Sequence, residues 1–161
     1  MTINDIPVDG KTRVAYVPTI ASISAPTTTE LNAGILLQSV ITADGLIGYE
    51  PDTADVDTSA LDSTFDTKTI GRDSFSNTML RLKRQSGTDT AYNTLTRGTT
   101  GYIVIRRNVT STTAWASTQR VGVYPIICGQ TRELSPEANS VSRYEVATKI
   151  TDTPEIRANV A

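Results

Sequence analysis

Short runs in which apolar residues alternate with polar ones, or in which β-branched residues cluster, make up much of this chain. Residues 77–85 (NTMLRLKRQ) and 142–151 (SRYEVATKIT) alternate in this way, which is typical of a strand with one buried and one wet face. Residues 101–107 (GYIVIRR) are apolar at successive positions, which indicates a central strand covered on both faces. Two further strands are expected at residues 12–18 and 120–129. The pattern predicts a mainly β protein.

Turn residues divide these strands. Asp44-Gly45 separates two apolar runs within residues 35–50, and this dipeptide favours a tight hairpin turn. Residues 51–69 are acidic and lack sustained periodicity, so we expect a long acidic loop over about residues 44–69. Pro125 cannot donate to a strand ladder, which implies an edge position or a bulge for its strand.

One segment has the pattern of an α-helix, at about residues 86–98. Ser86 and Asp89 are spaced like a capping box, and Gly98 is placed to end the helix. Ala91 and Leu95 lie on one face, so this short helix must rest on an apolar surface to be stable. The sequence leaves open whether that surface lies in the same subunit or in a neighbour. Residues 25–34 add a single capped turn closed by glycine.

The residue inventory limits the chemistry. The chain has 161 residues, enough for one domain with its own core, but it contains no His and a single Cys. Most metal centres, catalytic triads and internal disulfides are thereby excluded, and we expect no enzyme activity, no cofactor and no metal site. Cys128 lies in an apolar strand and is expected to act as a small hydrophobic residue. No apolar run reaches the length of a membrane span, and the start lacks the features of a signal peptide, so we expect a soluble protein.

Charge is distributed unevenly although the formal net charge is only −2. No Lys or Arg occurs between Arg13 and Lys68, whereas carboxylates crowd the second half of that interval. Basic residues then dominate as far as Arg107. This separation suggests complementary surfaces within one copy or between copies. The candidates for subunit or ring contacts are Asp52, Asp55, Asp57, Asp62, Asp66, Arg81, Lys83 and Arg84.

Three motifs and their order resemble a known family. The motifs are APTTTELNAG (25–34), DTAYNTLTRGTTGYIVIRR (89–107) and VGVYPIICGQ (121–130), followed by a strand and a Val-Ala terminus. Together they resemble the major tail tube proteins of long-tailed, non-contractile bacteriophages, particularly the actinobacterial-phage group. The resemblance implies a β-sandwich or barrel-like subunit with one flanking helix, a long acidic loop and extended terminal arms.

The resemblance also implies an assembly. Six copies would close into a ring, rings would stack into a hollow tube, and viral DNA would pass through it without specific binding. Residues 44–69 would reach a neighbouring ring, and residues 1–10 and 152–161 would be the arms of a single domain. The partners would be the protein itself and the tape measure, tail terminator and distal tail proteins, with no membrane. The protein would be made in the bacterial host cytoplasm and located in the virion tail.

Other functions remain open at this point. Another ring-forming virion β protein, such as a tail terminator or head-tail joining subunit, would stop after one ring. A calcium- or carbohydrate-binding β-sandwich could use the acidic loop, although the spacing of an EF-hand is missing. The basic residues could contact DNA phosphates, but aromatic residues are scarce around them, and pairing with carboxylates or contact with solvent is the favoured interpretation.

Overall fold

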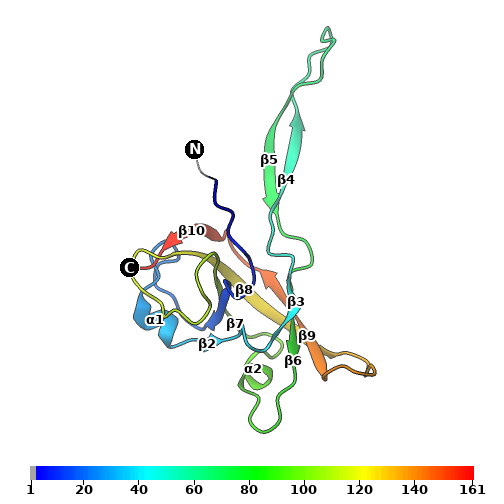
Figure 1. The fold of residues 1–161 in the computed structure, drawn as a ribbon. Helices are drawn as coiled ribbons and strands as arrows, with labels where there is room; N and C mark the ends of the chain where they lie inside the picture. The colour runs from blue at the N-terminus through cyan, green and yellow to red at the C-terminus, as the bar shows by residue number, and fades with distance from the viewer. Residues whose placement is uncertain (1–2) are drawn as a thin grey trace.

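Eight strands form one antiparallel sheet in the computed structural model, which describes residues 3–161 (Figure 1). The sheet order is β2-β1-β7-β8-β9-β6-β3, and β10 pairs with β8 beside this path. A separate two-stranded sheet consists of β4 and β5. The strands are β1 (Arg13–Val17), β2 (Ile35–Leu36), β3 (Ile41–Ile47), β4 (Asp52–Asp57), β5 (Lys68–Ser74), β6 (Met79–Lys83), β7 (Thr100–Arg106), β8 (Arg120–Glu133), β9 (Arg143–Ile150) and β10 (Glu155–Asn159). The mainly β fold predicted from the sequence is confirmed.

The sheet curls around an inner core. Side chains from its first strands and from its last strands meet in one cluster, which includes Val14 of β1, Ile103 of β7 and Leu82 of β6. The opposite face of β1, β7 and β8 carries a second core, in which Val104 packs with Trp115. Strand β7 is thus buried on both faces, as its continuous apolar run predicted.

Pro125 is predicted to lie at an edge or a bulge; its strand is central, so the edge position is wrong, while the pairing of this strand does contain register shifts. Strand β8 pairs with β7 on one side and with β10 and then β9 on the other. The Pro125 carbonyl accepts a hydrogen bond from the Thr151 amide, in the connection between β9 and β10. The nitrogen of Pro125 therefore faces the junction between these two strands. Its lack of an N–H costs no hydrogen bond of the sheet there. A register shift follows between Cys128 and Thr131.

The predicted helix at residues 86–98 is much shorter than expected. Helix α2 covers only Thr90–Thr94, and its N-cap is Asp89 rather than Ser86. Threonines at both ends disfavour a longer helix because β-branched side chains lose rotamer freedom there. Ala91 and Leu95 belong to the inner core, so α2 packs within its own subunit. The turn at residues 25–34 forms α1 (Thr28–Asn32), closed by a capping box between Thr27 and Glu30.

The predicted hairpin turn at Asp44-Gly45 is also wrong. Both residues lie inside β3, where the pairing with β6 is irregular. A Cβ atom at Gly45 would collide with the Arg81 carbonyl oxygen of β6, so glycine is required there for close approach of two strands. The Asp44 carboxylate turns to the Arg81 guanidinium, 2.8 Å away.

The predicted acidic loop at residues 44–69 is not a continuous loop, since it contains the end of β3, all of β4 and the start of β5. After β3, strands β4 and β5 pair and extend away from the body of the molecule (Figure 1). We call residues 52–74 the hairpin and residues 58–67 its tip. A hairpin replaces the expected loop because cross-strand pairing satisfies its backbone groups even without a core.

The two terminal segments differ from each other. Residues 3–10 of the predicted N-terminal arm are exposed and form no strand, while residues 1 and 2 lie outside the described part. The C-terminal segment 152–161 is not an extended arm, since β10 pairs with β8. Ala158 and Val160 are buried in the second core, which ties this end of the chain to its own subunit.

Candidate assembly interface

The hairpin is held together by its own cross-strand contacts. Directly opposite pairs include Asp57 with Lys68 and Asp55 with Ile70. The Lys68 ammonium contacts the Asp55 carboxylate at 2.9 Å on one face. Both side chains are more than half exposed, so this ion pair stabilises the hairpin by no more than about 1 kcal/mol.

Exposed apolar side chains mark the hairpin as a contact surface. Val56 and Ile70 are exposed on its two faces, and Leu61 and Phe65 are exposed at its tip. A two-stranded hairpin without a covering layer is marginally stable in water. Apolar side chains on a protruding element gain stability only when another surface covers them.

The hairpin is also strongly acidic. Its six carboxylates and two cations give it a formal charge of −4. The hydrogen bond from the Ser59 backbone amide is the main cause that holds the pKa of the Asp57 carboxyl below its ordinary value. The five sequence-predicted acidic candidates, Asp52, Asp55, Asp57, Asp62 and Asp66, all lie on this element and are exposed.

The three basic candidates do not join them. Arg81 lies on β6 and is bonded to Asp44 and Glu145 of its own chain, so its charge is already compensated. Arg84 contacts Asp89 at 3.3 Å and stacks its guanidinium 3.6 Å from the centre of the Tyr92 ring. Lys83 ends β6 and is half-buried. The eight candidates thus form an acidic hairpin and a separate basic strand, not one site.

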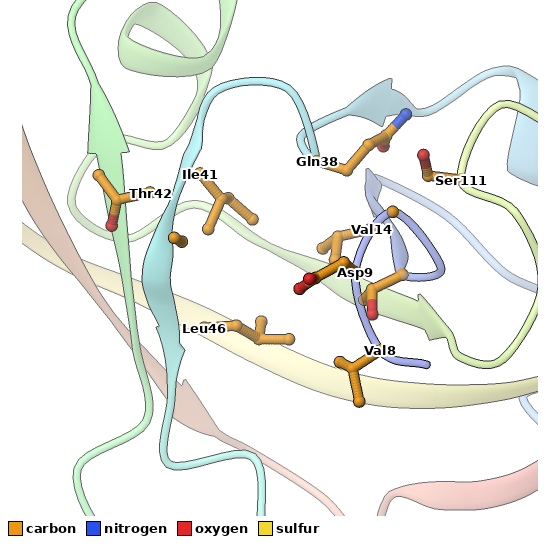
Figure 2. A pocket seen from close by; sticks show the side chains of 11 residues that line it. Val8, Asp9, Val14, Gln38, Ile41, Thr42, Leu46 and Ser111 are labelled. Atoms are coloured by element: carbon orange, nitrogen blue, oxygen red, sulfur yellow. The ribbon is translucent and has the colours of Figure 1, made fainter. Parts of the chain in front are cut away.

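Two grooves flank the elements that carry the hairpin. The first, which we call the N-terminal groove, has a volume of about 370 Å³ and lies between residues 8–12 and β3. Figure 2 shows Ile41 and Leu46 of β3 facing Val14 and Asp9 across it.

The second groove, which we call the hairpin-base groove, has a volume of about 600 Å³ and lies where β5 meets the connection from β9 to β10. Phe75, Ile150 and Pro154 contribute apolar surface. The charged lining residues are two cations and two carboxylates: Arg72, Lys149, Asp73 and Asp152. Sequence reasoning missed both grooves, because each is formed by segments far apart in the chain.

Clusters of metal-ligand side chains and membrane-spanning helices are both lacking from the part of the chain that the structure describes. No group of three or more potential ligand side chains gathers within residues 3–161. Neither of the helices described there has the length and apolar character that crossing a membrane requires.

Comparison with known sequences decides the family. A family described as phage tail tube protein matches residues 1–161. The chain belongs to the phage tail tube protein family. It is therefore a structural subunit of the tail tube and a component of the virion tail, which confirms the resemblance to tail tube proteins but not the particular phage group. No curated protein matches this tail tube protein in sequence.

A solved structure shares the fold of this tail tube protein. A chain of the cryo-EM structure of the anti-feeding prophage (AFP) baseplate, 6-fold symmetrised, aligns with a TM-score of 0.60 at 9% sequence identity. That alignment covers 97% of this chain and 98% of the other. The crystal structure of Hcp protein aligns at 13% identity over 86% of this chain and 87% of the other, with a TM-score of 0.39 that is too low to support an argument.

Proposed function

We propose that six copies of this tail tube protein close into a ring, and that rings stack into a hollow tube through which viral DNA passes. The observation that carries the assembly is the hairpin, whose exposed apolar side chains have no surface of their own subunit to cover them. The six-fold symmetry applied to the AFP baseplate, which shares the fold, supports the number of subunits.

Two kinds of contact are needed for this assembly. A ring needs a heterologous contact that closes, and a stack needs a second contact that repeats along the axis. The terminal strands β2 and β3 each have one edge without a strand partner within residues 3–161, and such edges can pair with a neighbouring chain. We assign side-by-side contacts in the ring to these edges and ring-to-ring contacts to the hairpin.

The remaining partners follow from the position of the tube in a tail. The tube would enclose the tape measure protein and end at the tail terminator and the distal tail protein. The subunit would act by assembly and passive conduction, without catalysis, and it would be synthesised in the host cytoplasm. The actinobacterial-phage group remains a prediction from the sequence motifs.

Negative-stain electron microscopy of the purified protein tests the proposal. We expect rings with six subunits in end views and tubes built from stacked rings in side views. Rings of another symmetry would contradict the subunit number. A protein that stays monomeric at high concentration, or that forms single rings only, would contradict the tube itself.

Removing the hairpin tests its role in stacking. Residues 51–74 would be replaced by a Gly-Ser-Gly linker, since deletion of residues 51–66 alone would leave β5 without its partner. Tyr49 and Phe75 stay, because both belong to the inner core. We expect an unchanged circular dichroism spectrum of the body and the loss of tubes in favour of rings or monomers. Normal tubes from this variant would show that the hairpin has no part in stacking.

A further inference from the structure

The tip of the hairpin combines two apolar side chains with negative charge. Leu61 and Phe65 are 107% and 77% exposed, which is unusual for residues of their size. Each is followed directly by a carboxylate, Asp62 and Asp66, and residues 58–67 contain no cation. A surface that receives this tip must therefore offer apolar area and positive charge side by side.

The subunit cannot cover its own tip. The ladder between β4 and β5 holds the tip at the end away from the body (Figure 1). From Asp52 to Asp57 strand β4 advances five residues, which corresponds to about 17 Å at about 3.3 Å per residue, and the tip continues beyond it. A paired hairpin of this length cannot fold back to its base without breaking its ladder. The tip can only be covered by another molecule.

The hairpin-base groove has the chemistry that the tip requires. Arg72 and Lys149 line it, are exposed, and make no ion pair within the described residues 3–161. The groove also holds two carboxylates, each with a local donor: Asp73 accepts from the Thr53 hydroxyl at 2.6 Å, and Asp152 accepts from the Thr153 amide at 2.7 Å. These neutral donors leave both carboxylates charged, so the formal charge of the groove is balanced. Arg72 and Lys149, which have no ion-pair partner within residues 3–161, are the groups able to pair with incoming carboxylates.

Apolar surface accompanies these cations. Phe75, Ile150 and Pro154 line the same groove and are only half-buried in the isolated subunit. The groove volume of about 600 Å³ lies within the range of about 300–1,000 Å³ that holds ligands of several side chains' size. Leu61 and Phe65 would bury apolar area here, at roughly 25 cal/mol for each Å² removed from water.

The N-terminal groove is the competing receptor, and charge argues against it. It offers Val14, Ile41 and Leu46 as apolar surface, but its ionisable lining residue is Asp9. Figure 2 shows the Asp9 side chain directed into this groove. Asp62 or Asp66 placed beside Asp9 would be repelled, and like charges brought together at an interface are strongly unfavourable.

We propose that the hairpin tip of one copy docks in the hairpin-base groove of another copy, with Asp62 and Asp66 against Arg72 and Lys149. This inference rests on the proposed tube assembly and names the receptor of its ring-to-ring contact. Because the donor and the receptor are different surfaces, the contact is heterologous, and a heterologous contact that does not close into a ring repeats along the tube. Because tip and base are the two ends of one strand ladder, the length of the docked hairpin would set the spacing between the copies that it joins.

Engineered disulfides test the contact directly. In the variant Ser63→Cys with Thr151→Cys, oxidation should link the tip of each copy to the groove of the next and give a ladder of multimers on a non-reducing gel. Ser63→Cys with Ala43→Cys places the second thiol at the N-terminal groove and should give no ladder. Ser63→Cys alone measures tip-to-tip dimers. The native Cys128 is buried and remains outside the reaction.

Charge reversal provides a second test. Asp62→Lys with Asp66→Lys should reduce the pelleted tube fraction at least about tenfold, because the tip then meets like charge. Adding Arg72→Glu with Lys149→Glu should restore tubes. The matched control adds Lys11→Glu with Arg107→Glu, two cations elsewhere on the body, and should not restore them.

The outcomes separate this inference from the proposed function. Two results would overturn the docking site and leave the tube in place, provided that the wild type forms tubes. One is no ladder of multimers from the Thr151→Cys pair, and the other is a ladder from the Ala43→Cys pair. Failure of the Arg72→Glu and Lys149→Glu pair to rescue would overturn it as well. A wild-type protein that forms no tubes would instead contradict the proposed function.

Discussion

Arg106 is fully buried, and the oxygens that bind its guanidinium belong to no carboxylate within residues 3–161. Four hydrogen bonds of 2.8–3.1 Å tie it to the segment that connects β7 and β8. The acceptors are the carbonyl oxygens of Thr110, Thr113 and Ala114 and the side-chain oxygen of Gln119. Desolvation lowers the pKa of Arg106, and the nearby charge of Arg13 lowers it further.

Arg106→Ala removes these four bonds and leaves a cavity in the body. A hydrogen bond to a charged group contributes about 1.5–3 kcal/mol, but the four are not additive, and the mutant no longer bears the desolvation of a cation. Truncation of large buried side chains costs about 2–5 kcal/mol. We expect a loss of about 3–5 kcal/mol, which corresponds to a fall in Tm of roughly 6–20 °C for a chain of this size.

Trp115 offers a local probe for this measurement. It is the single Trp of the chain, and its ring centre lies 5.2 Å from the Arg106 guanidinium carbon and 4.9 Å from that of Arg13. Equilibrium unfolding in urea, followed by Trp115 fluorescence and by circular dichroism, gives the free energy of unfolding. Arg107→Ala is the matched control, since Arg107 is exposed and next in sequence. An Arg106→Ala loss below about 1 kcal/mol, or equal to that of the control, would refute the reasoning.

Three further predictions concern other buried groups. Burial raises the pKa of the Glu145 carboxyl, but hydrogen bonds from Arg81 and Arg132 outweigh it and leave the pKa below its ordinary value. Stability from this cluster is therefore present above the ordinary pKa of a glutamate, about 4.3, and is lost as the pH falls through the lowered pKa, so Glu145→Gln should flatten that acid limb of a Tm-against-pH profile. Burial raises the pKa of the Cys128 thiol to about 11, so thiol reagents at pH 8 should react with it only at the rate of unfolding; immediate labelling would contradict its burial. Val160→Ala should cost about 1.5–3 kcal/mol in the same urea assay, whereas a free C-terminal arm would show no change.

Strands with one buried face could be predicted from the sequence, because burial imposes alternation on their residues. The runs at 77–85 and 142–151 correspond to β6 and β9, in which Leu80, Leu82, Tyr144 and Val146 face the core. The C-terminal segment has the same alternation at Ile156, Ala158 and Val160, so the sequence contained the pattern of a strand where an arm was predicted. At Asp44-Gly45 local turn preference was overridden by tertiary contact, because the glycine serves close approach to Arg81.

The hairpin lacks this alternation of apolar and polar residues. Both of its faces are exposed in the subunit, so nothing within the chain selects apolar residues at alternate positions, and β4 reads as Asp-Thr-Ala-Asp-Val-Asp. Its β-branched residues, Thr53, Val56, Thr69 and Ile70, were a weak signal that the acidic composition masked. On the tube proposal, the surface that selects Leu61, Phe65 and their flanking carboxylates belongs to a neighbouring copy. Residues selected by an interface follow the pattern of the partner's groove rather than the period of their own strand. The acidic charge of the hairpin could therefore be predicted from the sequence, whereas the groove that would receive its tip could not.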